Sequence, residues 1–157
     1  MIRRFFVVAC LVVLVSFPAT IASAKPFKAT LTGNANLSPT PDPTVFRNDE
    51  TGVGNATHLG KFIWTDIEYA DFDEIPGGIS VVATFTMTAA NGDKVLGTFT
   101  SVGVFADAVT LVIHGTYQVV DGTGRFAGAS GTGDIDAIAL LAPGLPFSGT
   151  LKGTLNY

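Results

Sequence analysis

Residues 79–90 alternate apolar and polar side chains, and this pattern constrains the fold more than any other feature of the chain. The apolar positions are Ile79, Val81, Ala83, Phe85 and Met87. A period of two is that of an extended strand with one buried face. Asn91-Gly92 follows directly and favours the tight turn of a β-hairpin. We therefore predict that residues 95–104 return as the antiparallel partner strand.

Similar β-type segments occur along most of the chain. They span residues 27–32, 56–68, 108–120 and 147–157, with a further apolar run at 135–142. In residues 56–68 both alternating faces carry apolar groups, so the sequence does not identify which face points inward. Residues 38–44 contain three prolines and are predicted to form a loop that continues to Gly54, because proline cannot donate to a strand ladder.

These segments together predict the fold class. Helical periodicity of useful length is absent from the sequence after residue 24. Several strands at short spacing, separated by turn residues, are typical of a sandwich or a barrel. Internal glycines such as Gly60, Gly97 and Gly115 favour a strongly coiled sheet. We predict an all-β protein with a single antiparallel β-barrel domain over residues 25–157.

Residues 1–24 have the parts of a secretory signal peptide in the usual order. Arg3 and Arg4 precede an apolar run of 13 residues at 5–17, and Ala22-Ser23-Ala24 forms a small-x-small cleavage site. A membrane-spanning helix needs about 20 apolar residues. We therefore expect cleavage, with no stable membrane anchor, and a secreted protein that is extracellular or periplasmic. Cys10 is interpreted as a small apolar residue of the signal segment.

Removal of this segment changes the composition in two ways. It takes away the only cysteine, so the mature chain is free of disulfides and a cysteine-stapled scaffold is excluded. It also leaves seven Lys and Arg residues against thirteen Asp and Glu, a net charge of about −6. Such a surface repels phosphate groups, so nucleic acid and anionic membranes are not expected as partners. The oligomeric state stays open.

Residues 122–131 read Gly-Thr-Gly-Arg-Phe-Ala-Gly-Ala-Ser-Gly and resemble the Gly-Thr-Gly-Arg-Phe-x-Gly-Ala signature of allene oxide cyclase and dirigent-like barrels. Residues 54–62 and 89–93 resemble small bacterial secreted proteins of that superfamily without assigned function. The resemblance implies an eight-stranded antiparallel barrel with a central cavity. It implies no activity, since the catalytic residues of plant cyclases and the polar pocket of dirigent proteins match no positions here.

The matched residues have structural explanations. Gly122, Gly124 and Gly128 permit a tight turn, Phe126 can plug a barrel end, and Arg125 can bind loop carbonyls. A nucleotide site would require a helix after these glycines, whereas another strand is predicted there. No cofactor is expected.

The titratable residues form no recognisable catalytic or metal motif. His58 and His114 lack ligand spacing, and His58 is the better candidate because its neighbours belong to the distinctive 54–62 segment. Residues 66–74 contain five carboxylates without the EF-hand pattern: Asp66, Glu68, Asp71, Asp73 and Glu74. A solvated acidic loop is the preferred interpretation. No metal ligand is assigned, and cation binding by this loop is left open.

The leading functional hypothesis is a non-enzymatic secreted barrel that binds a small apolar molecule in its lumen or presents its surface to a partner. The residues expected near such a ligand are His58, Phe62, Trp64, Phe85 and Phe99. One alternative is a cyclase-like or isomerase-like enzyme that acts by confinement, which requires an inward carboxylate or histidine. Another is an extracellular structural module. No nucleophile motif decides between them.

Overall fold

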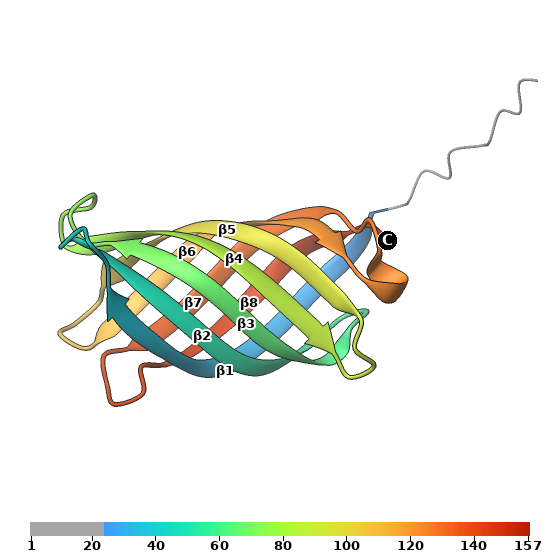
Figure 1. Cartoon of the computed structure of the whole chain (residues 1–157), viewed down its shortest axis with the longest axis horizontal. Helices are drawn as coiled ribbons and strands as arrows, with labels where there is room; N and C mark the ends of the chain where they lie inside the picture. The colour runs from blue at the N-terminus through green and yellow to red at the C-terminus, as the bar shows by residue number, and fades with distance from the viewer. Residues whose placement is uncertain (1–23) are drawn as a thin grey trace, which may run out of the picture.

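The computed structural model describes residues 24–157, which form a closed eight-stranded antiparallel barrel (Figure 1). The elements are β1 Lys25–Pro39, β2 Val45–Ala56, β3 Gly60–Asp71, β4 Gly78–Ala89, β5 Lys94–Phe105, β6 Thr110–Gly122, the 3-10 turn η1 Gly124–Phe126, β7 Gly131–Leu140 and β8 Pro146–Leu155. Each strand pairs with the next, and β8 pairs with β1 to close the sheet. The predicted signal peptide and Cys10 lie outside the described residues.

The predicted all-β barrel is confirmed, including the hairpin between β4 and β5. Gly92 has φ 88° in its turn, a conformation that glycine adopts without steric cost. The loop predicted over residues 38–54 is wrong, because β1 continues to Pro39 and β2 begins at Val45. Only residues 40–44 connect the two strands. Polar residues and glycines hold the inward positions of β2, so the apolar alternation that marks a strand in sequence is missing there.

The inward face of β3 is also settled. Phe62, Trp64 and Asp66 are buried, whereas Ile63 and Ile67 are exposed. The interior of the barrel is filled mainly by aromatic and aliphatic side chains from all eight strands. The even-numbered positions of β3 therefore face the lumen, and they bring Asp66 and Glu68 there with Trp64.

Inward glycines lie opposite inward aromatic rings in three strand pairs. The register places Gly54 opposite Phe62, Gly97 opposite Phe85, and Gly133 opposite Tyr117. A Cβ at any of these glycines would overlap the facing ring. The absent side chains thus give the rings room to lie against the neighbouring strand, which is how a narrow barrel accommodates so many aromatic residues.

The Gly97→Ala variant is expected to lose about 2 kcal/mol of unfolding free energy, because the new methyl overlaps the Phe85 ring and the Gln118 carbonyl. Gly149→Ala is the matched control, since its Cβ would have its nearest neighbours at 3.3 to 3.5 Å. We expect the control to lose less than about 1 kcal/mol. Urea unfolding of both variants measures the difference, and equal losses would contradict the steric explanation.

The segment that carries the Gly-Thr-Gly-Arg-Phe sequence closes one end of the barrel. Phe126 is completely buried and packs edge-to-face on Tyr157, with 4.9 Å between ring centroids. Arg125 donates a hydrogen bond to the His58 carbonyl, and its Nε lies 3.8 Å from an Asp93 oxygen. These contacts join the β2–β3 turn, the β4–β5 turn and the C-terminal end of β8. Within residues 24–157, no helix is long and apolar enough to cross a membrane.

Candidate functional site in the barrel lumen

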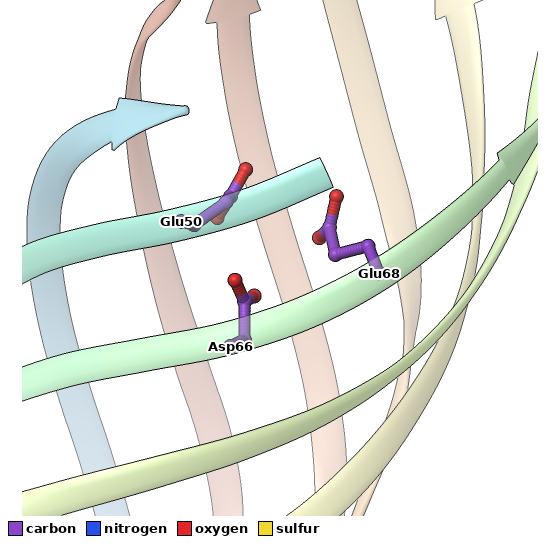
Figure 2. Close-up of side chains that lie close together, drawn as sticks. All are labelled: Glu50, Asp66 and Glu68. Carbon is purple, nitrogen blue, oxygen red and sulfur yellow. The ribbon is translucent and has the colours of Figure 1, made fainter. Parts of the chain in front are cut away.

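Three carboxyl groups converge inside the barrel from two adjacent strands. In the β2–β3 register Glu50 is opposite Asp66, and Glu68 follows Asp66 two residues along the same face. Residues two apart on a strand point to the same side of the sheet. One oxygen from each of the three carboxyl groups lies within 4.8 Å of one from the others (Figure 2). We call Glu50, Asp66 and Glu68 the carboxyl cluster.

Asn48 orients the two glutamates of the carboxyl cluster. It is 6% exposed and lies opposite Glu68 in the register. Its Nδ2 donates to Glu50 Oε1 at 3.1 Å and to Glu68 Oε2 at 2.8 Å. A single amide thus bridges the two side chains across the strand pair, which favours the charged form of each and limits their rotation.

Asp66 is the member of the cluster with the least compensation. Its side chain is 5% exposed, and neither carboxyl oxygen makes a hydrogen bond of normal geometry with any residue in 24–157. The buried indole N–H of Trp64 also lacks such a partner, although this N–H, the Glu50 backbone and the Glu50 carboxyl group all lie near enough to Asp66 to lower the pKa of that carboxyl. Buried polar groups are nearly always paired in folded proteins, so this one requires an explanation.

The electrostatic environment favours protonation of the cluster. Burial raises the pKa of Glu50 to about 10, and negative charge on Glu68 and Asp66 adds to the shift. Burial and the charge of Glu68 raise the pKa of Asp66 to about 8, and burial raises that of Glu68 to about 7. No lysine, arginine or histidine of the described chain is buried beside them. At neutral pH the three groups are therefore neutralised mainly by bound protons, and a member that ionises has no basic side chain beside it.

A small internal cavity adjoins the cluster. Its volume is about 30 Å³, which is space for about two water molecules. The three carboxyl groups and Trp64 form one side, and the opposite side is apolar. The apolar and glycine positions of the lining are Leu31, Phe99, Ile113, Ile135, Ala137, Phe147 and Gly149. The lumen is therefore packed, and its remaining space is of ionic or aqueous size.

The residues that were expected near a ligand have different positions in the structure. Trp64 and Phe99 line the cavity, and Phe85 stacks on Trp64 with ring centroids 4.9 Å apart. Phe62 is buried nearer the β2–β3 turn and does not line the cavity. His58 lies in that turn, with its Nε2 3.1 Å from the Pro26 carbonyl. The structure thus gathers three of the aromatic residues and leaves the histidine outside.

The acidic segment 66–74 is divided between two environments. Asp66 and Glu68 point into the lumen, whereas Asp71 ends β3 and Asp73 lies in the turn that follows, where its N–H donates to Asp71 Oδ1 at 2.9 Å. Glu74 accepts a hydrogen bond from the Ser80 hydroxyl. The single-loop interpretation of these five residues is therefore wrong, because the strand continues to Asp71 and its alternation separates them.

Sequence reasoning missed Glu50 and Asn48 because both fell in the segment predicted as a loop. The sequence did contain a signal. Asn48 and Glu50 are two residues apart and so share one face of an extended strand, whereas Arg47 and Asp49 share the other. Arg47 and Asp49 form an exposed ion pair at 2.6 Å. Hence the outward charges of β2 pair with each other, and the inward ones face the carboxyl groups of β3.

Chemically, the cluster can hold protons or coordinate a cation through carboxylate oxygens. It offers no nucleophile other than these oxygens. A scan of protein-family models, a search of curated proteins and a search of solved structures each found no match to this chain.

Proposed function

We propose that this barrel is a binding protein that takes a small, positively charged species into its lumen at the carboxyl cluster. The observation that carries the proposal is Asp66, a buried carboxyl group that makes no hydrogen bond of normal geometry within residues 24–157 and lies beside two further carboxyl groups. Transfer of a carboxylate from water to a protein interior costs several kcal/mol unless a counter-charge is present. The described chain supplies no buried basic group, so the cluster is neutralised either by protons or by a bound cation that takes their place.

The size and lining of the cavity support a small cation over an apolar ligand. A volume of about 30 Å³ is roughly a tenth of the smallest typical pocket for an organic ligand. An apolar molecule would have to displace packed rings such as Trp64 and Phe99, and it would then lie against carboxyl groups. A confined cyclase or isomerase has the inward carboxyl groups that it requires, but its substrate would need the same additional space.

We also propose that the protein is exported and related to the allene oxide cyclase and dirigent-like barrels. Export is supported by the pattern of residues 1–24, and the relationship by the barrel topology together with the Gly-Thr-Gly-Arg-Phe segment at one barrel end. Neither proposal determines the ligand. Placement in an extracellular or periplasmic space would expose the barrel to millimolar salts, among which small cations are abundant.

The proposed function predicts a cation-dependent change in Trp64, the only tryptophan of the chain. The purified protein at pH 8 should shift its tryptophan emission and melt several degrees higher with at least one of K⁺, ammonium, methylammonium, Mg²⁺, Ca²⁺ or Mn²⁺. Asp66→Asn should lose the response, and Asp71→Asn, at the end of β3 and outside the cavity lining, should keep it. If no member of this panel changes emission or melting temperature, the proposal fails; a response to apolar compounds alone would favour the apolar-ligand hypothesis instead.

A further inference from the structure

We infer that the species held by the carboxyl cluster is a hard divalent cation of the Ca²⁺, Mg²⁺ and Mn²⁺ class, coordinated by Glu50, Asp66 and Glu68. This inference rests on the proposed function and specifies its ligand. The second observation, besides the three acidic residues themselves, is that Asp66 lines the cavity, and both of its oxygens are buried and make no hydrogen bond of normal geometry within residues 24–157.

The spacing of the oxygens fits a single ion. Hard divalent cations bind oxygen at about 2.0 to 2.6 Å, so two ligands on opposite sides of one ion lie about 4 to 5 Å apart. The three carboxyl groups each place an oxygen within 4.8 Å of the others. They can therefore contact a common centre with small rotations of their side chains, and without a change in the backbone of β2 or β3.

The charges favour a divalent ion over a monovalent one. Three ionised carboxylates and one divalent cation leave a single negative charge in the lumen, whereas a monovalent cation leaves two. Uncompensated charge in a protein interior is costly, so the larger ionic charge is preferred.

The ligand types select hard metals. Only carboxylate oxygens converge on this centre, and neither His58 nor His114 lies in the cavity lining. Zn²⁺ and Cu²⁺ favour nitrogen and sulfur ligands, while carboxylates and water suit Mg²⁺, Ca²⁺ and Mn²⁺. The cavity has room for an ion and about one water, so most of the oxygen ligands would come from the carboxylates, which can bind through both oxygens.

Asn48 prepares the site as a positioning residue. Its two amide hydrogen bonds hold Glu50 and Glu68 at 3.1 and 2.8 Å, on either side of the space into which Asp66 projects. Glutamates have more rotatable bonds than aspartate and lose more conformational freedom when they bind an ion. Because the amide has already restricted them, less freedom remains to be lost on metal binding.

Isothermal titration of the chelator-treated full protein with Ca²⁺, Mg²⁺ and Mn²⁺ at pH 8 tests the inference. We expect one ion per chain for at least one metal, and affinity at least 100-fold weaker in Asp66→Asn and in Glu68→Gln. Asp73→Asn is the matched control, since it removes an acid from the exposed turn, and its affinity should stay within about 2-fold. The second cluster variant keeps the test valid if Asp66→Asn does not fold.

Mn²⁺ electron paramagnetic resonance provides a direct readout, because a bound ion loses the spectrum of the hydrated one. Equal Mn²⁺ binding by wild type and both cluster variants would overturn the inference, as it would place the metal on the acidic surface. Binding of K⁺, ammonium or methylammonium through Asp66, without any divalent ion, would overturn the inference and leave the proposed function intact. Failure of every cation would overturn both.

Discussion

In the presence of a chelator, the barrel is expected to become less stable as the pH rises from 5 to 9. In the unfolded chain the carboxyl groups of the cluster lose their protons near pH 4. In the barrel the pKa values are raised to about 7 for Glu68, about 8 for Asp66 and about 10 for Glu50. Between these limits the folded state binds more protons than the unfolded state, so deprotonation opposes folding and stability falls with pH.

The slope is about 1.4 kcal/mol per pH unit for each proton that only the folded state retains. Between pH 5 and pH 7 the expected loss is therefore at least about 3 kcal/mol. Urea unfolding across this range measures it, and Glu50→Gln should flatten the curve because the amide cannot ionise. A barrel that gains stability as the pH rises through this window would show that the cluster is already ionised and compensated. Addition of a divalent cation that the cluster binds should restore stability at pH 8.

Phe126→Ala is expected to cost about 4 kcal/mol of unfolding free energy, because it removes a completely buried ring from the closed end of the barrel. The ring of Tyr157 would lose its contact with the Phe126 ring. Phe72→Ala is the control: Phe72 is 40% exposed and lies at the opposite end, where it contacts Phe46. Its loss should be below about 2 kcal/mol.

Chemical unfolding of both phenylalanine variants gives the comparison. Equal losses of unfolding free energy would mean that the Phe126 ring does not stabilise the closed end of the barrel. Amide hydrogen exchange adds a local measurement, since opening of this end should accelerate exchange in the β2–β3 turn, which Arg125 joins to η1. The carboxyl cluster is remote from Phe126, so any cation affinity of the folded variant should be unchanged.

The parts of the fold with a clear local code could be predicted from the sequence. The β4–β5 hairpin was recognisable because apolar alternation and Asn91-Gly92 agree. The strand β2 was not recognisable, because its central inward positions are Asn48, Glu50, Gly52 and Gly54. The apolar residues of that face, Phe46 and Ala56, stand only at its ends. Gly52 and Gly54 are opposite Trp64 and Phe62, so β3 supplies the bulk that β2 lacks. That compensation depends on register, which a single sequence does not display.

The candidate site was missed for the same physical reason. Asp66 and Glu68 were noticed as part of an acidic loop, yet their importance comes from pointing inward beside a strand that had been taken for a loop. Trp64, Phe85 and Phe99, three of the five residues expected near a ligand, lie together, because large aromatic residues on strands are most often buried. The polar part of the lumen could not be predicted in the same way, because its residues are recognised only once the pairing of β2 with β3 is known.

Pairing of β1 with β8 leaves the sheet without a free edge, and this closure has a kinetic consequence. An ion in the lumen cannot leave through the wall while the ladder is intact, so it must await a transient opening at an end or between two strands. Its residence time is then set by the breathing of the barrel more than by the strength of the coordination. Two variants with the same equilibrium affinity could therefore retain the ion for very different times, and the rate of release would measure how often the barrel opens.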